Sequence, residues 1–294
     1  RGAERSFAVN AFLSYVIHGL AVGCSFALLA SGIIIIYRVT RVVNLAQGSF
    51  AVIAAFTAAA LLAAGLPHGV AELVATLTAA AVGLVAGWVA IAKHGTSPQA
   101  SLIATLGLAI FGYAVEILIW GDQPRGFSGL EGSFELAGVD FPKQYALVAV
   151  VTLTVFGLLE VFFERTYLGK ALSACASNPY AAKLVGISVV RMGLVGFALG
   201  GALGGIAGVL VTPLSPLSYD SDVSLFVSGF ASAIVAGLKR PLLALGGGLF
   251  LGVAESLIAG YAKASYQSAV ALLLTLAILV VQGLLRPTLH TADE

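Results

Sequence analysis

The sequence predicts an all-α polytopic membrane protein with about 8–10 transmembrane helices, including broken helices and inverted repeats. Three observations predict this fold class. Of the 294 residues, 59% are hydrophobic and 10% are charged, whereas soluble domains carry about 25% charged residues. Apolar stretches of about 20 residues, enough to cross a bilayer core as a helix, recur along the chain. Glycine contributes 35 residues, and small residues let membrane helices approach closely.

Nine segments meet this criterion in length and apolar character. They are 13–36, 49–65, 70–92, 99–120, 144–163, 189–211, 223–238, 241–260 and 268–285. Two stretches beside Gly or Pro residues, 38–48 and 237–248, are expected to enter the membrane without crossing it. One such break in each half of the chain is the pattern of an inverted repeat. Residues 1–294 are therefore interpreted as a single transmembrane domain.

Loop charges predict the orientation, because Lys and Arg gather on the cytoplasmic side. Segment 164–191 carries four basic residues and one acid, whereas 121–143 carries four acids and two bases. We therefore expect a cytoplasmic loop at 164–188 and an external loop at 121–143. Alternation along the chain then places 213–222 outside and the C-terminus in the cytoplasm. A net charge of +1 offers no basic field for nucleic acid.

The cytoplasmic loop contains the start and stop signals of a short helix. Asn178 is a suitable N-cap, Pro179 takes the first helical position, and Gly186 is a suitable stop. A helix over 178–186 on the membrane surface would suit the docking of a peripheral partner. A plain connector is the alternative.

Several motifs along the chain occur in the same order as in one known family. They are Gly169-Lys170-Ala171, Ala182, Gly186-Ile187, the stretch 19–37, Val43-Asn44-Leu45-Ala46-Gln47-Gly48, the stretch 246–255 and Arg286-Pro287. Together they resemble permease subunits of branched-chain amino-acid ABC importers, over nearly the whole chain. Where that family usually reads Asn-Phe-Ala-His-Gly-Glu, this chain has Gln47 and Ser49, which leaves the substrate open.

The resemblance implies partners, a location and a coupling site. The expected partners are two ATPase subunits that bind ATP and Mg²⁺, a second permease subunit, homologous or identical, and an external solute-binding protein. The expected location is the bacterial inner membrane. Coupling to the ATPases is assigned to Gly169, Lys170, Ala171, Asn178, Pro179, Ala182 and Gly186.

The chain itself lacks the sequence signals of an enzyme or a motor. No G-x-x-x-x-G-K-[ST] loop for nucleotide phosphates occurs, so ATP hydrolysis is expected on partner subunits. No catalytic or metal cluster is predicted, and no cofactor is expected on this chain. Among acids near membrane depth, Glu72, Glu116 and Glu160 lie close to span ends and are expected to reach water. An ion-coupled transporter or channel for urea or short amides is the alternative, and a paired carboxylate at membrane depth would favour it.

Polar residues at one chain break are the candidates for the translocation path. Asn44, Gln47 and Ser49 precede and open an apolar helix, as in broken helices whose N-termini face a polar ligand. An ordinary loop is the alternative. Glu255 lies deeper in its span and is interpreted either as a path residue or as a hydrogen-bonding group within the bundle. Aliphatic amino acids, urea or short amides, and small aromatic or carboxylic acids all suit such a path.

Glycines at four-residue spacing are predicted to pack helices together. They are Gly196, Gly200, Gly204 and Gly208. Such a face permits close helix approach and suits rigid-body rocking of one half against the other. On the external side, segments 121–142 and 213–222, the latter with Asp220 and Asp222, are candidates for contact with the solute-binding protein. A passive loop is the alternative.

Overall fold

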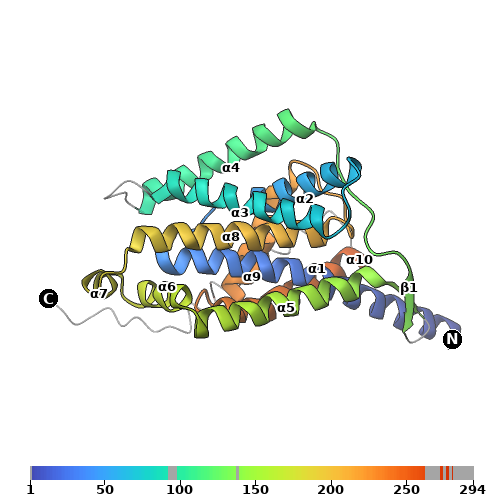
Figure 1. Ribbon diagram of the computed structural model, residues 1–294. Coiled ribbons are helices and arrows are strands. Elements are labelled where there is room, and N and C mark those ends of the chain that lie inside the picture. Colours follow the sequence, from blue (N-terminus) through green and yellow to red (C-terminus); the bar gives the residue numbers. More distant parts are fainter. Residues whose placement is uncertain are drawn as a thin grey trace.

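The computed structural model is a bundle of helices that mostly run along one common axis (Figure 1). It describes residues 2–91, 98–136, 139–261 and the isolated positions 272–273, 276–277 and 280. The helices are α1 (Gly2–Thr40), α2 (Gln47–Ala63), α3 (Val70–Ile91), α4 (Pro98–Trp120), α5 (Lys143–Arg165), α6 (Tyr167–Ser177), α7 (Pro179–Leu184), α8 (Val189–Val211), α9 (Ser221–Val235) and α10 (Ala244–Tyr261). A 3-10 turn, Pro241–Leu243, precedes α10, and strands β1 (Ser133–Leu136) and β2 (Val139–Pro142) form an antiparallel hairpin.

The helices confirm an all-α polytopic membrane protein. In the described part of the chain, 6 helices are long and apolar enough to cross a membrane, and α2 and α9 are shorter apolar helices. Each of the first eight predicted segments corresponds to one of these helices. The ninth, 268–285, lies outside the described residues except for a few isolated positions. The inverted-repeat relation stays a prediction.

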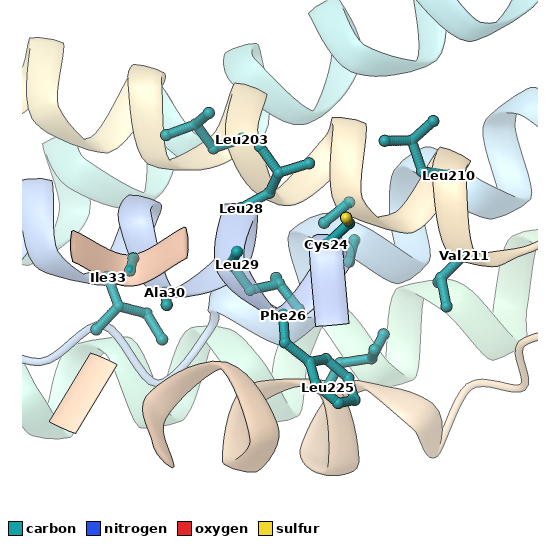
Figure 2. Packing of buried hydrophobic residues seen from close by; sticks show 14 of the residues in the cluster. Cys24, Phe26, Leu28, Leu29, Ala30, Ile33, Leu203, Leu210, Val211 and Leu225 are labelled. Carbon is teal, nitrogen blue, oxygen red and sulfur yellow. The ribbon is translucent and has the colours of Figure 1, made fainter. Parts of the chain in front are cut away.

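The central helix is α1, which packs against α8, α9 and α10. Figure 2 shows Phe26, Leu28 and Leu29 of α1 meeting side chains of α8 and α9, among them Leu203 and Leu225. Glycine residues let the backbone of α1 approach the backbone of α10 closely. A Cβ added at Gly23 would lie 2.7 Å from the Gly248 carbonyl oxygen, so only glycine fits there.

The predicted glycine face of α8 packs against α1 and α2, although its members differ. A Cβ at Gly208 would overlap the backbone of Ala51, whereas at Gly196 the nearest atom lies 3.8 Å away. Gly200 and Gly204 also border a side chain, because added Cβ atoms there would crowd the amide of Gln47. These two glycines therefore make room for a polar group as well as for a neighbouring helix.

Both predicted chain breaks contain left-handed backbone. Arg41, with φ 59°, directly follows α1, and Leu238, with φ 55°, follows α9. After the first break, Gln47 at the start of α2 contacts Gly200, near the middle of the 23-residue α8. The first turn of α2 therefore lies inside the bundle rather than at its surface. After the second break, Ser31 Oγ of α1 donates to the Pro241 carbonyl oxygen at 2.9 Å.

The hairpin and α6–α7 lie at opposite ends of the bundle (Figure 1). The end of α1 contacts α6, because Arg41 Nη2 donates to the Ala176 carbonyl oxygen at 3.0 Å. Arg38 and Arg41 therefore share the end of the predicted cytoplasmic loop. Segment 121–143, which was predicted to be an external loop, contains the β1–β2 hairpin.

Candidate functional site

The break before α2 holds a buried network of amide side chains. Asn44 and Gln47 are both fully buried. Asn44 Oδ1 accepts from the Ala46 N–H at 3.2 Å, and Asn44 Nδ2 donates to Gln47 Oε1 at 3.4 Å. Gln47 Nε2 donates in turn to the Gly200 carbonyl oxygen at 2.8 Å. The network fixes the unwound backbone in the interior, where unpaired polar groups would be costly.

A second helix begins at the same place as α2. Ser49 Oγ, in the first turn of α2, donates to Asp222 Oδ2 at 3.2 Å, and Asp222 Oδ1 accepts from the Val223 N–H at 2.6 Å. A Cβ on Gly48 would overlap the Asp222 carbonyl group, so the two backbones touch. The N-terminal ends of α2 and α9 therefore meet inside the bundle, where both carry positive partial charge.

The prediction that Asp222 contacts an external protein is wrong. Its side chain is buried, whereas Asp220 is exposed. The carboxylate accepts hydrogen bonds from the Val223 N–H in the first turn of α9 and from Ser49 Oγ, so it faces the bundle and cannot meet an external protein. Sequence position alone suggested exposure because the residue directly follows a loop.

The prediction that Glu116 reaches water is also wrong. The residue lies only four positions before the end of α4 and was expected to reach water, yet it is fully buried. Neither carboxylate oxygen has a hydrogen-bond partner among the described residues. Asp222 interacts electrostatically with it. Gly112 explains the burial, because its missing side chain lets α4 lie against Ser49, which turns this face of α4 inward.

Glu255 belongs to a different contact. It is 2% exposed and accepts a hydrogen bond from Ser228 Oγ of α9 at 2.9 Å. This bond links α10 to α9, as expected if Glu255 is a hydrogen-bonding group within the bundle. A role for Glu255 in the path stays a prediction.

The predicted coupling loop is a pair of helices rather than one. α7 follows the expected pattern: Asn178 Oδ1 accepts from the N–H groups of Tyr180 and Ala181, both at 3.0 Å, with Pro179 at the first position. Gly186, with φ 83°, follows the end of the helix. The sequence reasoning missed α6, although Thr166 offers an N-cap signal: its Oγ1 accepts from the Gly169 N–H at 3.0 Å.

The α6–α7 pair is fastened to the membrane helices on one face and exposed on the other. Leu172, Cys175 and Ala182 are buried in one cluster with Val39 of α1. Gly169 allows contact between α6 and α5, because an added Cβ would overlap the backbone of Phe162. The opposite face carries large exposed side chains, namely Tyr167, Tyr180, Leu184 and Val185. Lys170 and Lys183 are also exposed.

Burial raises the pKa of the Cys175 thiol. Desolvation disfavours the thiolate, so this cysteine behaves as an apolar packing residue. The structure thus supports a packing role for it within α6.

The two segments that were predicted to be external, 121–143 and 213–222, are joined through their backbones. The Arg125 N–H donates to the Leu217 carbonyl oxygen at 2.8 Å, and the Leu217 N–H donates back at 3.0 Å. The Arg125 guanidinium also caps α4, with Nη2 donating to the Trp120 carbonyl oxygen at 2.7 Å. The two segments predicted to be external are therefore connected rather than independent loops.

Comparison with known proteins places these features in one family. The family model described as branched-chain amino acid transport system / permease component matches residues 15–280. The branched-chain amino acid permease protein LivH of Escherichia coli is 27% identical, over 92% of this chain and 93% of the relative. A probable permease protein LivH of Methanocaldococcus jannaschii is 31% identical, over 81% of this chain and 78% of the relative.

A solved structure shows a similar fold at low sequence identity. PsaBC from Streptococcus pneumoniae in complex with Fab matches with a TM-score of 0.52 and 14% identity, covering 91% of both chains. At that identity the likeness concerns the fold alone.

Proposed function

Because the chain belongs to the family of branched-chain amino acid transport system permease components, we propose that it carries aliphatic amino acids across the inner membrane. The chain is a permease subunit of an ABC importer and works with ATPase partners. The observation that carries the proposal is the family match over residues 15–280. The Glu116 and Asp222 carboxylates at membrane depth do not restore the ion-coupled alternative, since the relatives over most of the chain are permeases of branched-chain amino acids.

The proposed assembly has this chain paired with a second permease subunit, homologous or identical, two ATPases and an external binding protein. The exposed side of α6–α7, with Tyr167, Tyr180 and Leu184, suits an ATPase groove, because exposed apolar and aromatic groups at a rigid element favour docking. ATP and Mg²⁺ would bind on the ATPases. The connected external surface around Arg125 and Leu217 is the proposed docking site for the binding protein.

The proposed mechanism transmits motion from α6–α7 to the break before α2. ATPase closure would displace α6, and the Arg41 to Ala176 hydrogen bond and the Val39 contact would carry that displacement to the end of α1. The next residues lead directly to Asn44 and Gln47, which we propose line the path with Ser49. Glycine contacts along α8 permit helices to slide as packed units, in keeping with alternating access.

The coupling assignment is tested at the exposed face of α7. Tyr180→Ala together with Leu184→Ala removes two exposed side chains. Because neither side chain is buried in the fold, the permease should remain folded. ATPase co-purification and L-leucine uptake should each fall at least tenfold in cells expressing the whole system. Leu130→Ala, at another exposed apolar residue and on the proposed external side, is the control and should leave ATPase association unchanged. Normal association and uptake by the double variant would refute the assignment.

A further inference from the structure

The unpartnered carboxylate of Glu116 raises a question that packing does not answer. An ionised carboxylate withdrawn from water is costly unless a cation or hydrogen-bond donors compensate it. Glu116 has neither among the described residues, and no ion pair there neutralises Asp222. Two acids thus share a buried region without a resident positive side chain. Such an arrangement suits a site that is completed by a cationic ligand.

The polar atoms around Glu116 converge on a small region. Glu116 Oε1 lies 4.0 Å, and Ser49 Oγ 3.3 Å, from the point where a Cβ on Gly112 would stand. Ser49 Oγ in turn lies 3.2 Å from Asp222 Oδ2. These oxygens come from α4, α2 and α9, three elements far apart in the sequence. Glu116 and Ser49 therefore border the position of Gly112, and the Asp222 carboxylate lies on the other side of its hydrogen bond with Ser49.

The chemistry of this oxygen set matches a primary ammonium group. An ammonium carries three N–H donors and no acceptor, and each of the three side chains has an oxygen that can accept a hydrogen bond. Tyr113 and Tyr219 stand three residues before Glu116 and Asp222 respectively, with ring centroids 5.0 Å apart. Aromatic faces attract cations, so this pair favours the same ligand charge.

A second part of the site, close to Ser49, favours a negatively charged group of the ligand. The N-terminal ends of α2 and α9 meet beside Ser49, and helix N-termini attract carboxylates. A zwitterionic solute has both groups. Urea, short amides and carboxylic acids each lack the ammonium group and would leave the Glu116 carboxylate without a cation.

We propose that Glu116, Asp222 and Ser49 form a transient subsite for the primary ammonium group of the transported solute. This inference rests on the proposed function, and it selects amino acids over the other small solutes that the path would accept. Glu116 is the central residue of this subsite, because neither of its carboxylate oxygens has a hydrogen-bond partner in the part of the chain that the structure describes.

The test uses the complete transporter in proteoliposomes with its binding protein and internal ATP, and L-leucine is the probe. Glu116→Gln keeps the size of the side chain and removes its charge. Uptake should fall at least tenfold. The melting temperature of the purified variant should be no lower than that of the wild type, because the substitution removes a buried acid that has no partner among the described residues. Glu160→Gln, on an exposed position of α5, is the matched control and should retain uptake within twofold.

Asp222→Asn supplies an independent reading at the second carboxylate. Its amide oxygen can still accept from the Val223 N–H, so uptake should fall while the protein stays folded. Unchanged uptake by Glu116→Gln, or a loss of uptake that accompanies a lower melting temperature in both variants, would overturn the subsite. Wild-type uptake that requires Na⁺ or K⁺ would assign the acids to a metal cation and would also overturn it. A wild-type transporter that carries no amino acid would instead refute the proposed function.

Discussion

The two ends of the α8 glycine face provide a matched pair of substitutions, Gly208→Ala and Gly196→Ala. Both positions are helical, so alanine gains about 1 kcal/mol of helix propensity at each, and this gain cancels in the comparison. At Gly208 the added methyl group would stand 2.6 Å from the Ala51 carbonyl carbon and 2.8 Å from its Cα. At Gly196 the nearest atom is 3.8 Å away, an ordinary contact.

Overpacking of this kind costs about 1–3 kcal/mol, so Gly208→Ala should be less stable than Gly196→Ala by about that amount. The assay is thermal unfolding of the two purified variants in the same detergent and at the same heating rate. A lower midpoint is expected for Gly208→Ala, whereas Gly196→Ala should match or exceed the wild type. Equal midpoints for the two variants would refute the claim that α8 touches α2 at Gly208.

Three further predictions concern α6–α7 and the start of α9. Asn178→Ala removes the cap of α7 and should cost about 1 kcal/mol locally, seen as faster amide exchange of the α7 backbone; unchanged exchange would contradict it. At pH 7, Cys175 should react with a maleimide at least tenfold more slowly than a cysteine introduced by Ser177→Cys at the exposed end of α6, because burial and a raised pKa suppress its thiolate. Equal rates would argue against the packed α6. Asp222→Lys should abolish folding or membrane accumulation, because it buries an unmatched cation, whereas Asp220→Lys on the exposed neighbour should accumulate normally; equal accumulation would contradict the burial of Asp222.

The fold was largely predictable because local signals determine helices in a membrane. Segment lengths and apolar runs predicted the helices, and Asn178, Pro179 and Gly186 predicted α7. The same local reasoning did not predict α6, whose apolar face becomes visible only when Leu172 and Cys175 meet Val39 of α1. Short amphipathic helices depend on the surface that they cover.

The candidate site was predictable only in part, because it joins elements that are distant in the sequence. Asn44, Gln47 and Ser49 stood out as polar residues at the start of an apolar helix. Glu116 and Asp222 did not, since their positions near span ends predicted contact with water. Their burial depends on Gly112 and Gly48, which permit α4 and α9 to approach α2. Nothing within a single segment indicates such an approach.

The most direct test of the central claim is the energy source of transport. Proteoliposomes containing the permease, its ATPases and the loaded binding protein should accumulate L-leucine only with ATP inside, and collapse of the Na⁺ and proton gradients should leave uptake unchanged. Accumulation of L-leucine by this chain alone, driven by an ion gradient and indifferent to ATP, would contradict its role as the permease subunit of an ABC importer.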